Sequence, residues 1–313
     1  MLKAFYTDIF ELPLPPGHRF PMAKYRMLRE RVEGLAAEGL AELRLPRAAD
    51  DAMLRRVHDD DYLQRVTTGT LSASDVRQLG FPWSQGLVER SRRSVGATVD
   101  AAMAALDDGV GVNLAGGTHH AFADRGRGFC VFNDAVVAAR ALQAEGWARR
   151  VLILDLDVHQ GDGTAALTRG DDSIFACSLH GEKNYPFWKE ASDLDIALAD
   201  GTDDDGYLSA LSRALDECFA RFEPDLCVYL AGADPHEGDR LGRMKLTMDG
   251  LRRRDEMVFD MCTQCGLPVA VAMAGGYGHD VATTVDVHFQ TVRLAATVDR
   301  QKRSYGVSAV KGR

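Results

Sequence analysis

The stretch VLILDLDVHQGDG, residues 151–163, constrains the fold more than any other part of the sequence. Four aliphatic residues run into Asp155, and Asp157 and His159 follow at steps of two. A short aliphatic run of this kind predicts a strand that is buried on both faces, as in a parallel sheet. Because side chains alternate along a strand, we expect Asp155, Asp157 and His159 to leave its C-terminal end on one face. Such a group is costly to bury without a positive charge, so the stretch favours a metal site, with solvated acids and a helix N-cap as the alternative.

Aliphatic strands and helices alternate along the rest of the chain, which argues for an α/β fold with a mostly parallel sheet covered on both faces. Residues 67–83 are polar and irregular, and we expect them to form a long loop near a site. No change of composition divides the 313 residues, so we predict one domain over residues 1–313, with a loose tail from about residue 299. The expected further strands are residues 4–6, 43–45, 110–114, 173–180, 225–234 and 268–277, and the expected helices are residues 22–37, 49–65, 87–106, 133–143, 206–222 and 248–265.

Charge and cysteine usage exclude several classes of protein. The net charge is -9 and no basic stripe stands out, so we do not expect nucleic-acid binding, which depends on neutralising phosphates. The N-terminal residues MLKAFYTDIF show no apolar core long enough for a signal peptide, and no stretch approaches the length of a membrane span. The six cysteines lack the spacing of a disulfide framework, which predicts a reduced, cytoplasmic setting. Cys262 and Cys265 form a CxxC without a second pair, and we interpret them as packing residues.

Four of the predicted strands end in residues with unusual chemistry. These ends are residues 116–120 (GGTHH), 155–159 (DLDVH), 232–235 (GADP) and 275–278 (GGYG). In a parallel sheet all four lie at the same edge, where open α/β sheets bind their ligands. Each end alone has an ordinary explanation, such as a helix cap or a polar pair, but their convergence predicts a functional site.

Five runs of the sequence resemble, in order and separation, motifs of the zinc-dependent histone deacetylase family: GGTHHAFADRGRGFCVFNDA, DLDVHQGDG, CSLHG, AGADPHEGDRLG and AGGYG. The HQGDG motif and residues 237–259 look closest to the class IV branch and its bacterial relatives. The resemblance covers nearly the whole chain. It implies the arginase/deacetylase fold, a three-layer α/β/α architecture around a central, mostly parallel sheet.

The resemblance also implies a metal site formed by Asp157, His159 and Asp234. Two carboxylates and one imidazole leave a fourth position open for water and the substrate carbonyl, as catalytic zinc sites require. Zn²⁺ is the expected ion, and Fe²⁺ is compatible with the same ligand set. A structural K⁺ is also implied, held by Asp155 and Ser178 and by main-chain oxygens of Asp157, His159 and Leu179.

The catalytic roles follow from the same resemblance. His120 is expected to be the general base that activates water and later the acid for the leaving amine, with His119 as its electrostatic companion. Asp162 and Asp155 are expected to orient these two imidazoles. Tyr277 would donate a hydrogen bond to the substrate carbonyl as negative charge develops. The expected lining of the narrow acyl-lysine channel is Gly128, Phe129, Phe187, Leu241, Gly275 and Gly276.

Two departures from the class IV pattern bear on these assignments. Asp162 stands where vertebrate class IV enzymes carry Asn, so the partner of His120 is more like that of the other classes. Pro235-His236 follows Asp234 where class IV enzymes usually carry aliphatic residues, and His279 follows Tyr277 by two positions. The pattern assigns no role to His236 or His279.

Four functions compete at this point. The preferred one is a zinc hydrolase that removes acetyl or longer fatty acyl groups from lysine side chains of proteins or peptides. The main alternative is an amidohydrolase of the same fold that acts on acetylpolyamines or other small acylated amines. A dinuclear manganese ureohydrolase would need further Asp ligands after Asp234, and a silent acyl-lysine binding module would not need the full catalytic set. The sequence leaves the oligomeric state open.

Overall fold

The computed structural model describes residues 1–10 and 12–309. Its strands form one sheet in the order β2-β1-β3-β8-β7-β4-β5-β6, and every neighbouring pair is parallel. The mostly parallel sheet expected from the sequence is therefore confirmed. The strands are β1 (Leu2–Phe5), β2 (Ala41–Arg44), β3 (Val110–Asn113), β4 (Val151–Asp155), β5 (Ile174–Gly181), β6 (Leu194–Leu198), β7 (Leu226–Leu230) and β8 (Val269–Ala272).

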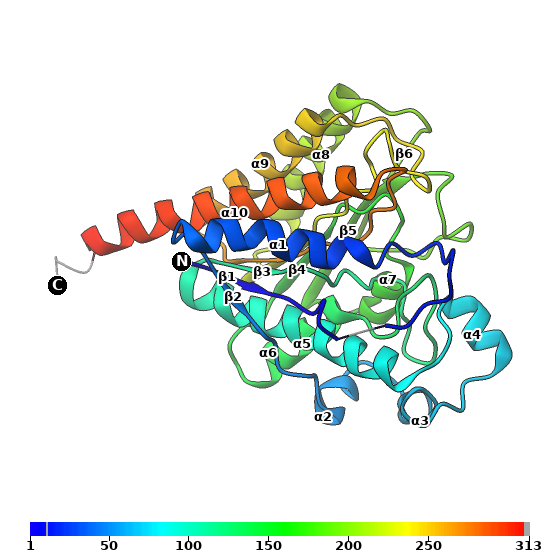
Figure 1. Ribbon diagram of the computed structural model, residues 1–313. Coiled ribbons are helices and arrows are strands. Elements are labelled where there is room, and N and C mark those ends of the chain that lie inside the picture. Colours follow the sequence, from blue (N-terminus) through cyan, green and yellow to red (C-terminus); the bar gives the residue numbers. More distant parts are fainter. Residues whose placement is uncertain (11, 310–313) are drawn as a thin grey trace.

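Helices cover both faces of the sheet, which gives the expected three layers (Figure 1). One face packs against α1 (Ala23–Ala37), α8 (Asp204–Arg221), α9 (Met248–Gln264) and α10 (Val281–Ala309). The other packs against α5 (Gln85–Asp108) and α6 (Asp134–Ala144). The remaining helices are α2 (Asp51–Leu54), α3 (Asp60–Thr68), α4 (Ala73–Leu79) and α7 (Asp162–Thr168).

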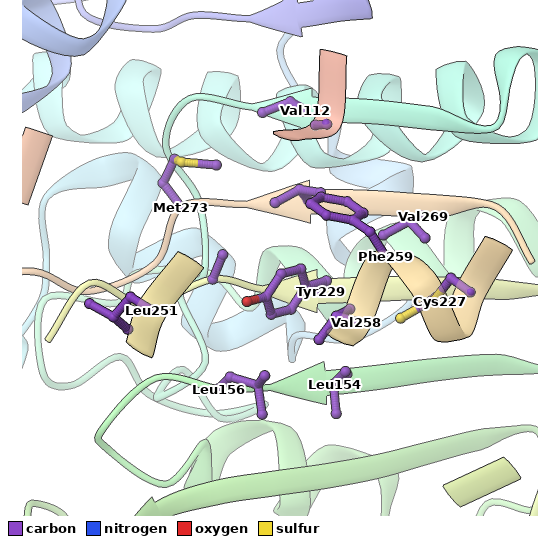
Figure 2. Packing of buried hydrophobic residues seen from close by; sticks show 14 of the residues in the cluster. Val112, Leu154, Leu156, Cys227, Tyr229, Leu251, Val258, Phe259, Val269 and Met273 are labelled. Carbon is purple, nitrogen blue, oxygen red and sulfur yellow. The ribbon is translucent and has the colours of Figure 1, made fainter. Parts of the chain in front are cut away.

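The central strands are buried on both sides, as their unbroken aliphatic sequences predict. All five residues of β4 and all five of β7 are buried. Alternate residues of these strands point to opposite helical layers: Leu154 and Tyr229 face α9, whereas Ile153 and Val228 face α5 and α6. Figure 2 shows the first layer, in which side chains from β3, β8, β7 and β4 meet Val258 and its neighbours on α9. This two-sided burial fixes the strands that carry the site.

The structure differs from the sequence-based expectation in several elements. The stretch expected as a long loop contains α4, which begins with a capping box between Ser72 and Asp75. The expected helix over residues 49–65 is two helices, because Asp50 caps α2 and the chain turns again before α3. Edge strand β6 and helices α7 and α10 were not expected. Since α10 continues to Ala309, the predicted loose tail is helical over 299–309, and residues 310–313 lie outside the described part of the chain.

The strands that carry the four unusual ends are neighbours in the sheet, in the order β3-β8-β7-β4. Because all four run in the same direction, the loops that follow them leave from one edge. The expected convergence of these ends is confirmed. No helix in the described residues is long and apolar enough to cross a membrane.

Candidate active site

Three predicted metal ligands meet in the loops that follow β4 and β7. The ligand atoms of Asp157, His159 and Asp234 lie within 4.8 Å of one another. His159 Nδ1 lies 2.9 Å from Asp157 Oδ1 and 3.2 Å from Asp234 Oδ2. The predicted grouping is confirmed, but the reason given for it was wrong. Strand β4 ends at Asp155, so Asp157 and His159 take their positions from the following loop and not from strand alternation.

The chemistry of this cluster fits a cation. Asp234 Oδ2 is buried and has no hydrogen-bond partner within the described residues. Burial raises the pKa of the Asp234 carboxyl to about 7, and the nearby charge of Asp157 raises it further, so the opposing effect of His159 does not compensate for both. Gly275 lies against the same oxygens, and a side chain at its position would collide with Asp234 and Asp157. The cluster therefore has the acidity and the space that a metal ion requires.

Main-chain amides hold the two carboxylates in place. The N–H of Val158 donates to Asp234 Oδ1 at 2.9 Å, and the N–H of Gly275 donates to Asp157 Oδ2 at 2.7 Å. Each bond joins loops from two different strands, so the ligands are fixed by the sheet that carries them. A fixed ligand set of this kind loses little entropy when it binds an ion.

The tandem histidines each pair with the predicted carboxylate. His119 Nδ1 lies 2.6 Å from Asp155 Oδ2, and His120 Nδ1 lies 2.6 Å from Asp162 Oδ1. Burial disfavours protonation of His119, but the charges of Asp155 and Asp157 outweigh it and raise its pKa to about 9. Burial and then the charge of His119 lower the pKa of His120 to about 4. His120 is thus a neutral imidazole at pH 7, able to accept a proton.

Tyr277 completes the expected catalytic set and is 8% exposed. Its main chain is anchored on both sides: its N–H donates to Asp239 Oδ2 at 2.6 Å, and Arg240 Nε donates to its carbonyl at 2.9 Å. The Tyr277 ring packs 6.2 Å from the Phe20 ring and 6.0 Å from the Phe129 ring. The ring is therefore held on an anchored loop in the cavity lining, which suits the expected role of Tyr277 as a preorganised donor.

A cavity of about 400 Å³ leads from the surface to these groups. Gly128, Phe129 and Gly275 line it, as expected. Leu241 and Phe187 also line it, and both side chains are exposed, Phe187 at 78%.

The expected channel position of Gly276 is wrong. Gly276 is not among the residues that line the cavity. A side chain at this position would collide with Thr284 of α10, so the position faces α10. Its φ of 151° lies outside the usual range of residues with a side chain, and its carbonyl accepts from Lys24 Nζ at 3.4 Å. Gly276 therefore shapes the loop that carries Tyr277.

Sequence reasoning missed Tyr185 and Arg127. The Tyr185 ring lines the cavity and packs edge-on at 4.9 Å from the His120 ring, so it belongs to the channel beside the expected Phe187. Arg127 Nε donates to the Tyr185 hydroxyl, and Arg127 Nη1 lies 3.2 Å from Asp162 Oδ2. Tyr185 lies in the loop after β5, two positions before Phe187. Its position beside an expected channel residue is the sequence signal that indicates a place in the cavity.

We expect Arg127→Met to lower kcat about 10-fold, the lower end of the loss typical for groups that orient a catalytic imidazole. Arg127 neutralises the second oxygen of Asp162, and without it that buried carboxylate keeps His120 as its one side-chain partner within the described residues. Arg127→Lys should restore part of the rate. Tyr185→Phe removes the hydroxyl that Arg127 contacts but leaves the contact between Arg127 and Asp162 in place, so it separates the two interactions. Steady-state kinetics on these three variants test the assignment. Full activity of Arg127→Met would remove Arg127 from the catalytic arrangement.

The predicted potassium site stays a prediction. Asp155 and Ser178 lie directly opposite each other on β4 and β5, as the site requires. Ser178 Oγ lies 3.0 Å from His180 Nδ1, and Asp155 Oδ1 accepts from the N–H of Asp157 at 3.2 Å.

The other unassigned histidines and the cysteines lie away from the main cavity. His236 Nδ1 accepts from the N–H of Gly238 at 2.9 Å, and neither His236 nor His279 lines the cavity. All six cysteines are free, and Cys262 is buried, in agreement with its interpretation as a packing residue. Cys265 is exposed.

Comparison with known proteins decides the family. A model described as the histone deacetylase domain matches residues 18–292. The chain belongs to the histone deacetylase family. Membership of this family implies a hydrolase, which agrees with the arrangement of His120, Asp162 and the cluster of ligands.

Relatives of this histone deacetylase family member are bacterial and eukaryotic. An uncharacterized protein of a Picosynechococcus species is 43% identical, covering 94% of this chain and 98% of its own length. Histone deacetylase 2 of Arabidopsis thaliana is 32% identical, covering 86% of this chain and 72% of its own length. The histone deacetylase-like amidohydrolase of Pseudomonas aeruginosa is 32% identical, covering 85% and 74% respectively. The crystal structure of an HDAC homolog from Aquifex aeolicus superposes with a TM-score of 0.79 at 24% identity, covers 94% of this chain and 83% of its own, and shares the fold.

Proposed function

We propose that the chain is a zinc-dependent amide hydrolase that removes acyl groups from lysine side chains of proteins or peptides. The observation that carries the proposal is a neutral imidazole, His120, held by Asp162 in the cavity wall close to the cluster of three predicted metal ligands. A volume of about 400 Å³ lies within the range of roughly 300–1,000 Å³ that is usual for small-ligand sites.

Each residue of the site has a separate role in the proposed reaction. Bound at Asp157, His159 and Asp234, zinc would polarise the substrate carbonyl and lower the pKa of a water molecule. His120 accepts the proton of the attacking water and returns a proton to the departing lysine amine. Asp162 keeps the proton of His120 on Nδ1, so that Nε2 is free to act. Tyr277 donates to the carbonyl oxygen as its negative charge grows.

Two further assignments belong to this proposal. Fe²⁺ could replace zinc, because a carboxylate and imidazole site binds several divalent metals. A potassium ion between Asp155 and Ser178 would offset part of the buried negative charge at the end of β4. The free, mostly buried cysteines support a reduced cytoplasmic setting.

The ureohydrolase alternative is not favoured by the geometry. In the described part of the chain, Asp157, His159 and Asp234 are the one cluster with three metal-binding side chains. Asp155, which could have served a second ion, is instead bonded to His119.

A panel of substrates tests the proposed function. The metal-reconstituted protein would be given acetyl-lysine peptides, myristoyl-lysine peptides and acetylputrescine. We expect kcat/KM for at least one acyl-lysine peptide to exceed that for acetylputrescine at least about tenfold, a normal degree of discrimination between related substrates. Protein stripped by a chelator is the control and should be inactive until zinc is returned. Preference for the polyamine would overturn the proposal in favour of the small-molecule alternative.

A further inference from the structure

Almost all charged Lys, Arg, Asp and Glu side chains that line the active-site cavity are positive. Among its described residues the one carboxylate is Asp157, a predicted metal ligand. The whole chain has the opposite balance, with a net charge of -9. The cationic lining residues are Arg19, Lys24, Arg77, Arg90, Lys183 and Arg243.

Four of these cations are exposed and surround the mouth. They come from four separate segments: Arg19 precedes α1, Arg77 lies on α4, Lys183 follows β5 and Arg243 precedes α9. Only Arg243 has a carboxylate partner within 4.0 Å in the described chain, Asp200 at 3.2 Å. A molecule that enters the cavity therefore meets positive charge from several sides.

Two cations are buried in the wall of the cavity. Lys24 is 2% exposed and donates to the carbonyls of Ala274 and Gly276, at 3.3 and 3.4 Å. Arg90 is 6% exposed and donates to the carbonyl of Thr7 at 2.9 Å. Both cations bond to main-chain carbonyls, and neither forms an ion pair with a carboxylate among the residues that the structure describes. Their charge is hydrogen-bonded but not neutralised by a carboxylate, so both add positive potential to the cavity wall.

The geometry points to a substrate in which the acylated lysine is flanked by acidic residues, an acidic segment of a protein or peptide. This inference rests on the proposed deacylase function and specifies its substrate. A positive mouth attracts anionic peptides and raises their association rate by roughly 10- to 1,000-fold, whereas it repels cationic ones. Acylated polyamines and lysine-rich tails carry the same sign as the mouth. They are therefore the poorer substrates.

A set of peptides of equal length tests the charge preference. Each carries one acyl-lysine, flanked by Glu in one peptide, by Ser in the second and by Lys in the third. At about 0.05 M salt we expect kcat/KM to fall at least about 10-fold from the Glu to the Lys peptide, mainly through KM. At about 0.5 M salt the ratio should shrink to roughly 2-fold, because the charges are screened.

Charge reversal at the mouth provides the matched test. The double variant Arg77→Glu/Lys183→Glu is expected to abolish or invert the preference for the Glu peptide. The control is Arg213→Glu/Arg253→Glu, which makes the same change of net charge at two exposed arginines outside the cavity lining. The control should keep the preference. An equal effect of both variants would show a general response to net charge and would overturn the inference.

The outcomes separate the inference from the function on which it rests. Hydrolysis of all three peptides at similar kcat/KM, or a preference for the Lys peptide, would overturn the acidic-substrate inference and leave the deacylase function intact. Failure to hydrolyse any acyl-lysine peptide would overturn the proposed function, and the inference with it.

Discussion

His120→Ala is expected to lower kcat by about 100- to 10,000-fold, the contribution typical of a positioned general acid and base. Two facts support an effect of this size. The neutral His120 has no substitute in the site, because Asp155 and Asp157 hold the pKa of the neighbouring His119 at about 9 and keep it protonated. The pair of His120 and Asp162 is also closed from solvent, so bulk water does not replace the imidazole efficiently.

The measurement is kcat with the preferred acyl-lysine peptide, together with the zinc content of the purified variant. Because His120 is not one of the three ligands, zinc content should stay near that of the parent protein. His279→Ala is the matched control, since His279 is an exposed histidine outside the cavity lining, and it should retain full activity. Retention of more than about a tenth of the parent kcat by His120→Ala would contradict the role of general base.

His120→Ala leaves Asp162 with Arg127 as its remaining side-chain partner. Loss of the hydrogen bond to a buried carboxylate costs about 1–3 kcal/mol of unfolding free energy, so some fall in Tm is expected. His120→Asn keeps a polar group at the position and separates this structural loss from the catalytic one. Both variants should be equally inactive if the imidazole itself transfers the proton.

The sequence predicted the convergence of the site because it depends on strand direction alone. Once β3, β8, β7 and β4 are parallel, the residues after them must share an edge, and each strand was recognisable from its aliphatic run. The exact path of the loops was less predictable. Asp157 and His159 were expected to alternate along a strand, but the strand ends at Asp155. Their positions depend on the hydrogen bond from Gly275 to Asp157 and on the ion pair of His159 with Asp234, which the sequence does not reveal.

Arg127 and Tyr185 were missed for a related reason. Both lie in loops, and their contacts join segments 58 residues apart, which no local pattern encodes. Helix α10 was missed because its buried face includes Thr284, His288 and Thr291, so its hydrophobic periodicity is interrupted. Strand β6 alternates between half-buried and exposed residues at the edge of the sheet and gives a weak signal. These errors lie outside the four central strands, which explains why the predicted site survived them.

Asp234→Ala is expected to abolish zinc binding and, with it, activity. The side chain is one of three predicted ligands, and its Oδ2 accepts no hydrogen bond within the described residues. A site reduced to one imidazole and one carboxylate falls below the three protein ligands that catalytic zinc sites have. Zinc content after dialysis should drop from about one ion per chain to below roughly a tenth, and kcat should become undetectable.

Asp234→Asn distinguishes loss of the ligand from loss of structure. An amide oxygen can still accept from the N–H of Val158, so the loops after β4 and β7 should stay joined. Asp216→Ala, at an exposed position on α8, is the control for a change of charge and should bind zinc normally. Retention of about one tightly bound zinc per chain by Asp234→Asn or Asp234→Ala would contradict the assigned ligand set.

Thermal unfolding gives a second reading of the same assignment that does not require activity. In the metal-free parent protein, burial and the repulsion from Asp157 raise the pKa of Asp234 despite the opposing effect of His159. Excess negative charge therefore remains in the cluster and lowers the stability of the folded chain. Zinc removes that imbalance and binds only the folded chain, so at 100 times its Kd it should add about 2.7 kcal/mol of stability. The Tm of the parent protein should therefore rise by several degrees on addition of zinc. The Tm of Asp234→Asn should not change on addition of zinc. The amide removes one of the two negative charges and is not a zinc ligand, so the ion gains nothing by binding the folded variant.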